Sequence, residues 1–362
     1  MPSWKLREGT VGDMEGILAC RRAAFAGVDP EKAQPDYWRW EFLDNHWGPS
    51  RFFVADDGGR IVGGYAVLPQ QFLLDGQPVL GSNVVDVMTD PEYWRQGMFT
   101  KLSHFSLDTC ARDSAMVFTT GYPIQPSVIA GHRKVGWQLP FRIPTWVQVL
   151  DATSLLRGKV PAIARLPGLA RLIGTPATLV NRALRARRPR RDVHVVRQPT
   201  VDERFGGFTE RFHATVPPGV ALQRRTADCL RWRYDANPGN VYTWHAASRG
   251  GVLCGLAVTR TRPLEGVDSI IVLDLMTSAT GRERRHIVEA LLADVRAHGR
   301  SQGAALLAMF LTRGSPLLPA PWALGFLPSP FVFSFITYPF REPERLQSPL
   351  RWHLMWGDTD AI

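Results

Sequence analysis

The chain has 362 residues, of which 45% are hydrophobic, so it can bury a sizeable core and is long enough for two domains. Its four cysteines form no C-x-x-C pair and no zinc spacing, which excludes a disulfide scaffold and favours buried thiols in a reducing compartment. The start has no apolar signal core and no run of transmembrane length. We therefore expect a cytoplasmic protein with no metal.

The formal charge of +10 is concentrated in one segment. Residues 152–191 carry ten of the 43 Lys and Arg residues and no acid, which leaves 33 basic against 33 acidic residues elsewhere. One interpretation is a solvated connector, and another is a surface for RNA or anionic lipid, because clustered arginines neutralise phosphates. The candidate RNA-binding residues are Arg185, Arg187, Arg188, Arg190 and Arg191.

Apolar periodicity and turn residues predict alternating strands and helices before this segment. In chain order they are a strand at 4–7, helices at 11–26 and 35–43, a hairpin of 52–56 and 61–68, strands at 72–74 and 79–88, a helix at 98–111, a strand at 115–119, a helix at 127–135 and a strand at 144–150.

The two halves of the chain repeat each other. Arg39-Trp-Glu-Phe-Leu-Asp-Asn45 resembles Arg231-Trp-Arg-Tyr-Asp-Ala-Asn237 at an offset of 192 residues, and Asp86-Val-Met-Thr89 matches Asp274-Leu-Met-Thr277. Further Gly and aromatic landmarks follow in the same order. We therefore predict an N-terminal domain at 1–151, a basic connector at 152–191 and a degenerate C-terminal domain at 192–362.

Residues 86–102 read as a strand, a Pro-containing turn, a glycine loop and an amphipathic helix. Backbone N–H groups at such a helix start lack intrahelical partners, and the helix dipole favours a phosphate there. The stretch resembles the pyrophosphate loop of the GNAT N-acyltransferase superfamily, Arg/Gln-x-x-Gly-x-Gly/Ala. Gly97 matches this pattern, whereas Trp94 and Phe99 replace its first basic and last small residues.

The resemblance implies an α/β (α+β) fold of two tandem GNAT-like domains, each a mixed, mostly antiparallel sheet flanked by helices. It also implies an acyl-CoA donor. The backbone amides of the loop would bind the pyrophosphate, namely Arg95, Gln96, Gly97, Met98, Phe99 and Thr100. The backbone of Val87, Met88 and Thr89 would bind the thioester carbonyl, and Gln125 the pantetheine arm.

Three residues are candidates for proton transfer. His132 stands where the family commonly has a Tyr general acid, and Tyr122 is the alternative acid. Asp86 is either a general base or a residue that orients backbone, since Asp274 occupies the same place in a half without the glycine loop. Tyr37, Trp38 and Trp40 lie where such folds bind the acceptor, although aromatics at helical spacing usually belong to the core.

The leading functional hypothesis is an N-acyltransferase that moves an acyl group from acyl-CoA to a primary amine of a small molecule or sugar. The second is a Fem-like transferase whose donor is an acyl- or aminoacyl-tRNA held by the basic segment. The third is a non-catalytic protein that binds a nucleotide or a partner.

Overall fold

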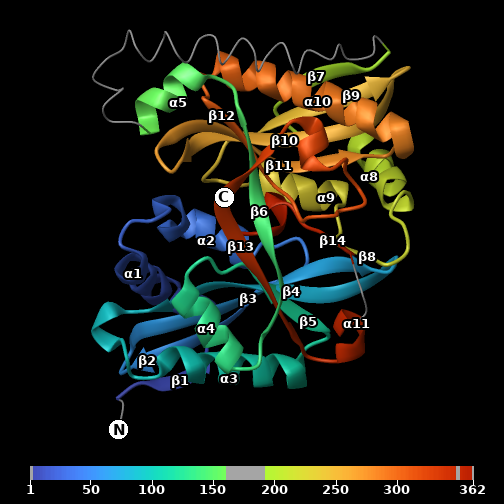
Figure 1. Ribbon diagram of the computed structural model, residues 1–362. Coiled ribbons are helices and arrows are strands. Elements are labelled where there is room, and N and C mark those ends of the chain that lie inside the picture. Colours follow the sequence, from blue (N-terminus) through green and yellow to red (C-terminus); the bar gives the residue numbers. More distant parts are fainter. Residues whose placement is uncertain (1–2, 160–191, 348–350, 361–362) are drawn as a thin grey trace.

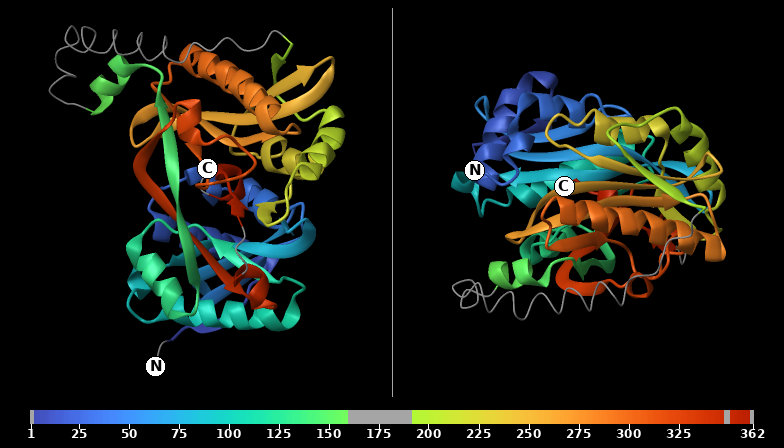
Figure 2. Two further views of the ribbon diagram at one scale, coloured as in Figure 1. Left: turned by 45° about the vertical axis from the view of Figure 1, so that its right-hand side comes forward. Right: turned by 90° about the horizontal axis from the view of Figure 1, so that it is seen from above.

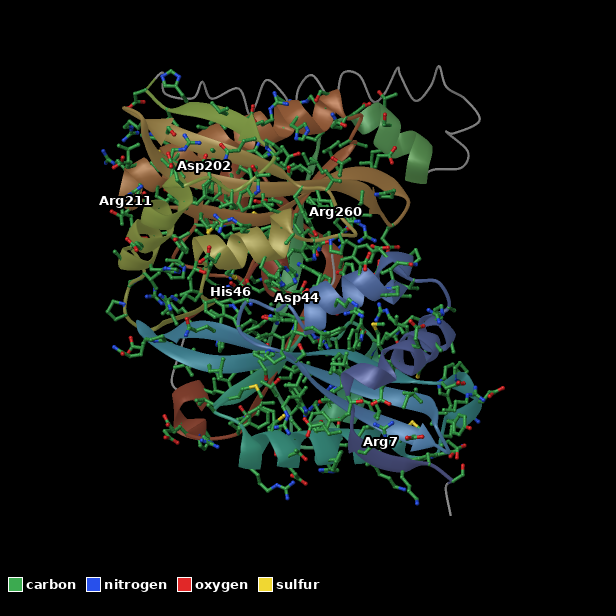
Figure 3. The ribbon with its side chains drawn as sticks, turned by 180° about the vertical axis from the view of Figure 1, so that it is seen from behind. Arg7, Asp44, His46, Asp202, Arg211 and Arg260 are labelled. Atoms are coloured by element: carbon green, nitrogen blue, oxygen red, sulfur yellow. The ribbon has the colours of Figure 1, made fainter. Side chains whose placement is uncertain are left out.

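The computed structural model describes residues 3–159, 192–347 and 351–360. The two halves of the chain lie one above the other, with the N-terminus at the far end of the first half and the C-terminus between the halves (Figure 1). Side chains from both halves fill the space between them (Figure 3). There His46 Nε2 lies 3.2 Å from Thr226 Oγ1, and Arg260 lies 3.8 Å from Glu31.

The first half follows the predicted order of elements; η marks short helical turns. Its elements are β1 (Lys5–Glu8), η1 (Val11–Asp13), α1 (Met14–Phe25), η2 (Pro30–Ala33), α2 (Pro35–Phe42), β2 (Arg51–Asp57), β3 (Arg60–Leu74), β4 (Gln77–Thr89), η3 (Pro91–Tyr93), α3 (Met98–Asp113), β5 (Phe118–Gly121), α4 (Pro126–Lys134), β6 (Gln138–Val149) and α5 (Ala152–Lys159). The strand predicted at 72–74 is the end of the long β3, and the strand predicted at 115–119 begins only at Phe118.

The second half repeats this order with an added strand after its first helix, a short turn in place of α4 and three further elements after the last shared strand. Its elements are β7 (His194–Gln198), α8 (Arg204–Ala214), β8 (Val220–Gln223), α9 (Ala227–Leu230), η4 (Arg231–Asp235), β9 (Thr243–Arg249), β10 (Val252–Leu264), β11 (Val267–Thr277), α10 (Gly281–Ser301), β12 (Leu306–Phe310), η5 (Pro321–Leu324), β13 (Leu327–Pro339), α11 (Pro343–Gln347), β14 (Arg351–His353) and η6 (Trp356–Asp358).

One continuous sheet joins the two halves, and its strand order is palindromic under the repeat. The order is β1-β2-β3-β4-β5-β13-β6-β12-β11-β10-β9-β7, with β8 and β14 off this path. Mixed pairing dominated by antiparallel neighbours, with helices on its faces, is the fold class that the sequence predicts.

Strands β6 and β13 are exchanged between the halves. β6 leaves the first half and pairs with β12, while β13 returns from the second half and pairs with β5. The two exchanged strands also pair with each other, and the rings of Phe141 and Phe335 stack there at 5.0 Å. Both strands are seen crossing between the halves in Figures 1 and 2. Each half is thus completed by a strand of the other.

Alternating side chains give the sheet of the first half two buried faces. Phe53 and Ala55 of β2 pack in a cluster with Met98 and Leu102 of α3. Phe52 and Val54 face the opposite way, into a cluster with residues of α1 and α2. This period of two is expected for a strand that is covered on both sides. No helix among the described residues is long and apolar enough to cross a membrane.

Candidate functional site

The central strands β4 and β5 separate along their length. They pair in parallel only at Ser82 with Thr119 and at Asn83 with Thr120. Beyond Asn83, the described strands pair with β4 only on its β3 side. Backbone N–H and C=O groups on the free side of residues 84–89, apart from the Thr89 carbonyl that accepts from Trp94 Nε1, are therefore available to a ligand.

A cavity of about 290 Å³ lies at this separation. One wall is mainly apolar and the other is charged. The lining residues are Arg21, Phe25, Val28, Asp29, Lys32, Val84, Val85, Asp86, Val87, Gly121, Tyr122, Pro123, Ile124, Gln125, Val128, His132, Ile336 and Asp360. The predicted residues Asp86, Val87, Tyr122, Gln125 and His132 are thus brought together, whereas Met88 and Thr89 follow along β4 outside the lining.

The glycine loop precedes α3 as predicted. Gly97 is the N-cap residue with φ of 74°, and Arg95 is also left-handed with φ of 65°. Residues 94–97 are exposed, and a Cβ on Gly97 would meet nothing within 4 Å. Gln96 is held by the Trp4 indole, whose Nε1 donates to its Oε1 at 2.9 Å. An exposed loop of left-handed residues at a helix start is a suitable anion site.

The two departures from the family pattern point away from the loop face. Trp94 turns back to β4, where its Nε1 donates to the Thr89 carbonyl at 3.1 Å. The Phe99 ring packs against α4, because a Cβ on Gly131 would lie 2.7 Å from its Cε1. Its centroid is 5.0 Å from that of His132. The large side chain at position 99 is therefore accommodated by a glycine on the neighbouring helix.

His132 is buried between two aromatic rings, those of Phe99 and Trp137, each 5.0 Å away. Its Nδ1 lies 2.9 Å from the Val128 carbonyl, so the tautomer assigned from this bond carries the proton on Nδ1. Burial lowers the pKa of His132 below its usual range. A neutral ring whose Nε2 has no hydrogen bond among the described residues is able to accept a proton, whereas the sequence suggested that an imidazolium donates one.

Tyr122 closes the cavity next to the second half. Its ring lies 5.6 Å from Phe335 and 6.4 Å from Phe310. Its hydroxyl is buried and has no hydrogen-bond partner among the described residues. Burial raises the pKa of Tyr122 well above its ordinary value, so the phenol keeps its proton at neutral pH.

Buried charges form the other wall. Asp86 makes an ion pair with Arg21 of α1, and Lys32 donates to the backbone carbonyl of Asp360 and lies 3.5 Å from its carboxylate. Behind them, burial raises the pKa of Glu41 to about 7, and its Oε1 has no partner in the described part of the chain. Because Asp86 is paired with Arg21, and Asp360 with Lys32, the charges of this wall largely compensate one another.

Sequence reasoning missed Arg21, Lys32 and Asp360. A signal existed for Arg21, since a charged residue beside Ile17, Leu18 and Cys20 lies on the buried face of a helix and needs a partner there. Asp360 lies far along the chain from this site, and only the tertiary structure places it there.

The predicted acceptor aromatics lie elsewhere. Trp38 is in the core and stacks on Phe52 at 5.1 Å, and Tyr37 packs edge-on against Trp40 at 5.0 Å. Trp40 lines a separate, open groove between the halves. None of the three lines the 290 Å³ cavity. The candidate RNA-binding residues Arg185, Arg187, Arg188, Arg190 and Arg191 fall outside the described residues.

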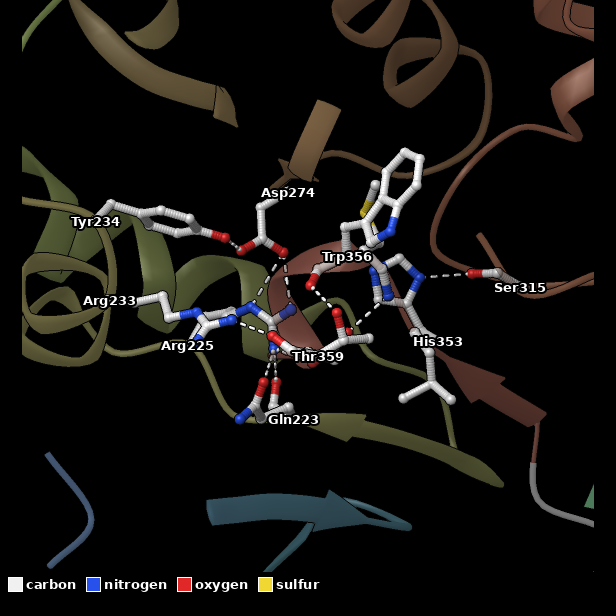
Figure 4. A network of polar contacts seen from close by, with 12 residues as sticks. Gln223, Arg225, Arg233, Tyr234, Asp274, Ser315, His353, Trp356 and Thr359 are labelled. Carbon is white, nitrogen blue, oxygen red and sulfur yellow. Dashed lines mark hydrogen bonds and ion pairs between the residues drawn. The ribbon is translucent and has the colours of Figure 1, made fainter. Parts of the chain in front are cut away.

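The corresponding place in the second half is filled by the end of the chain. Asp274, the counterpart of Asp86, is bound by Arg225 at 2.8 Å and by the Tyr234 hydroxyl. Figure 4 shows Arg225 and Tyr234 pointing toward Asp274. Gly357 lies against this pair, and Asp358 accepts from Arg225 at 2.6 Å. Only about 10 Å³ remains open beside Asp274. The open cavity of the first half therefore has no open counterpart among the described residues of the second.

Comparison with known proteins finds a family match in the first half of the chain. Residues 5–139 match the model of the acetyltransferase (GNAT) domain family. No curated protein matches the chain.

Solved structures with the same fold cover nearly the whole chain. A GCN5-related N-acetyltransferase from Anabaena variabilis is 14% identical with a TM-score of 0.60, covering 93% of this chain and 73% of its own. A probable N-acyltransferase from Enterococcus faecalis is 11% identical with a TM-score of 0.63, covering 96% and 74%. Eis1 from Mycobacterium abscessus is 13% identical with a TM-score of 0.53, covering 93% and 74%.

Proposed function

We propose that this chain, whose residues 5–139 match the acetyltransferase (GNAT) domain family, is an N-acyltransferase. In this proposal acyl-CoA is the donor, and a primary amine of a small molecule or sugar is the acceptor. The reaction takes place in the cavity beside β4.

The observation that carries the proposal is the separation of β4 from β5 directly beside an exposed helix start. The free backbone of residues 84–89 and the loop around Gly97 lie at the two ends of one stretch of chain. The first can donate to a thioester carbonyl, and the second can bind a pyrophosphate. Arg95 and Lys101 add positive charge next to the loop.

The residues of the cavity divide the proton transfers between them. When the amine attacks the thioester carbonyl, its nitrogen must lose a proton, and His132 Nε2 is the neutral acceptor at the cavity wall. The departing thiolate needs a proton, and the Tyr122 phenol retains one. The C–N bond forms as the C–S bond breaks, and the proton taken up by His132 then returns through solvent to the Tyr122 phenolate, so that both groups end as they began.

Two matched glycine variants test the donor site. Gly97 directly precedes α3, and Gly281 is the first residue of α10, the equivalent helix of the second half. Their φ values are 74° and 54°. Both Gly97→Ala and Gly281→Ala place a Cβ in a left-handed residue at similar cost. We expect Gly97→Ala to weaken acetyl-CoA binding about tenfold in calorimetry, while Gly281→Ala leaves it unchanged. Equal effects of the two variants would refute a donor site at Gly97.

The same titration separates the donor classes. We expect acetyl-CoA or longer acyl-CoAs to give heat of binding in calorimetry and to raise the melting temperature. Total tRNA should do neither. Stabilisation by tRNA alone would favour the acyl-tRNA alternative, whose residues lie outside the described part of the chain. Binding of acyl-CoA without turnover of any amine in a panel of small amines and amino sugars would favour the non-catalytic alternative.

A further inference from the structure

Asp86 has an unusual backbone conformation in the middle of β4. Its φ is 47°, in the left-handed region that side chains other than Asn and Asp rarely adopt. The register of β3 and β4 shifts at the same place, because Gly64 pairs with Met88 while Ala66 pairs with Val85. Asp86 and Val87 together therefore oppose a single residue of β3, which is a β-bulge.

The side chain of Asp86 ties this bulge to helix α1. Its carboxylate makes an ion pair with Arg21 Nη1 of α1, and the two side chains are only 7% and 6% exposed. The Arg21 guanidinium also lies 4.8 Å from the centre of the Phe25 ring. A carboxylate whose Oδ1 is paired with a buried arginine anchors the strand to the helix.

The second half shows the same pair without a ligand site. Asp274 is also paired with a buried arginine, Arg225, although this arginine comes from a different element. Its strand bulges one residue earlier, since Val258 pairs with Asp274 and Thr259 with Val272, and its cleft is filled. The Asp–Arg pair is therefore present in both halves, with and without an open cavity. The left-handed backbone is not: Asp86, which lines the cavity, has a positive φ, and Asp274 does not.

We propose that Asp86, pinned by Arg21, is a positioning residue that fixes the β4 bulge and thereby directs the backbone of Val87 into the donor cleft. The proposal rests on the proposed function, because it assigns that backbone to the thioester carbonyl. It decides between the two roles that the sequence leaves open for Asp86, and it excludes that of general base.

Three substitutions at one position separate these roles. Asp86→Asn retains a residue that tolerates the left-handed conformation and an oxygen that accepts from Arg21. Asp86→Gly retains the backbone freedom but loses the anchor, and Asp86→Ala loses both. We expect kcat to be highest in Asp86→Asn, lower in Asp86→Gly and lowest in Asp86→Ala, with the kcat of Asp86→Ala about tenfold below that of Asp86→Gly. KM for the amine and the acidic limb of the pH profile should be unchanged.

A general base would give a different pattern. All three variants would then lose kcat equally, and the acidic limb would disappear even in Asp86→Asn, which would overturn the proposal. Wild-type kcat in all three would overturn it too. If Asp86→Ala does not fold, the difference in kcat between Asp86→Asn and Asp86→Gly still distinguishes the positioning role from that of a general base. Amide hydrogen exchange at residues 84–89, faster in Asp86→Gly than in Asp86→Asn, gives a readout that is independent of turnover.

Asp274→Asn is the matched control. It weakens the equivalent buried pair in the half whose cleft is filled, so it should lower the free energy of unfolding but leave kcat unchanged. Failure of the proposed function is distinguishable, because the wild-type protein would then bind no acyl-CoA. Binding and turnover by the wild type, with three equally inactive Asp86 variants, would refute only the positioning role.

Discussion

Trp40 and Trp232 are reciprocal partners. The indole N–H of Trp40 donates to the carbonyl of Trp232 at 2.7 Å, and that of Trp232 donates to the carbonyl of Trp40 at 3.1 Å. Their rings stack at 5.3 Å with an interplanar angle of 21°. The two residues are 192 positions apart, which is the offset of the repeat. Contacts that exchange partners in this way mark a pseudo-two-fold axis between the halves.

This pair should contribute to stability as a unit. Trp40→Ala and Trp232→Ala should each lower the free energy of unfolding by about 2–4 kcal/mol, because each removes the shared ring contact and one hydrogen bond. The double variant should lose clearly less than the sum, since the ring contact is lost only once. Urea denaturation measures all three. Trp322→Ala, at a side chain that is 72% exposed, is the control with little effect. Additive losses would contradict the coupling.

His132 should produce an acidic limb in the rate profile. Because burial lowers its pKa, the ring is neutral above about pH 6.5 and becomes protonated only below that pH. We therefore expect kcat/KM to be flat at neutral pH and to fall in acid. His132→Gln should lower kcat by about 10²–10⁴ and remove this limb. His104→Gln, at an exposed histidine of α3, should change neither. If the acidic limb persists in His132→Gln, a group other than His132 is responsible for the fall in kcat/KM at low pH.

Calorimetry should find one acyl-CoA site in each chain, because Gly357 and Asp358 fill the second cleft. The fit at Gly357 is tight, since a Cβ there would lie 2.3 Å from the Tyr234 hydroxyl and 2.4 Å from Asp274 Oδ2. Gly357→Ala should lower stability by about 1–3 kcal/mol. Gly206→Ala, in a helix with nothing within 4 Å, should be neutral or slightly stabilising. Two sites in the wild-type chain would contradict this account.

His353 should make the fold sensitive to acid. Burial, with Arg225 and Arg284 nearby, lowers its pKa to about 3, and its Nδ1 lies 2.7 Å from Ser315 Oγ. In the unfolded chain the group takes up a proton near pH 6.5, while in the folded chain it stays neutral. Its contribution is therefore complete above pH 6.5 and is lost as the pH falls towards 3.

The loss amounts to at most about 1.4 kcal/mol per pH unit for this one group. Chemical denaturation of the wild type and of His353→Gln between pH 7 and 4 isolates it, because the difference between the two should shrink as the pH falls. A difference that does not change with pH would show that His353 is not the group responsible.

Much of the first half was predictable from local pattern. The strands and helices of residues 5–134 follow from apolar period and from turn residues such as those around Gly58 and Gly97, whose φ values of 61° and 74° require glycine-like freedom. The glycine loop was recognisable for the same reason. The Asp86–Arg21 pair was not, because its two residues are 65 positions apart and only packing brings them together.

The sequence by itself determined the repeat, the order of elements within each copy and the place of the loop, since these depend on neighbouring residues. The tertiary structure decided that β6 and β13 exchange partners. These strands are counterparts in the repeat, so either carries a pattern that suits β5 or β12, and local pattern cannot choose between them. It also decided that the end of the chain closes one of two similar clefts, because that choice depends on contacts across the pseudo-two-fold axis.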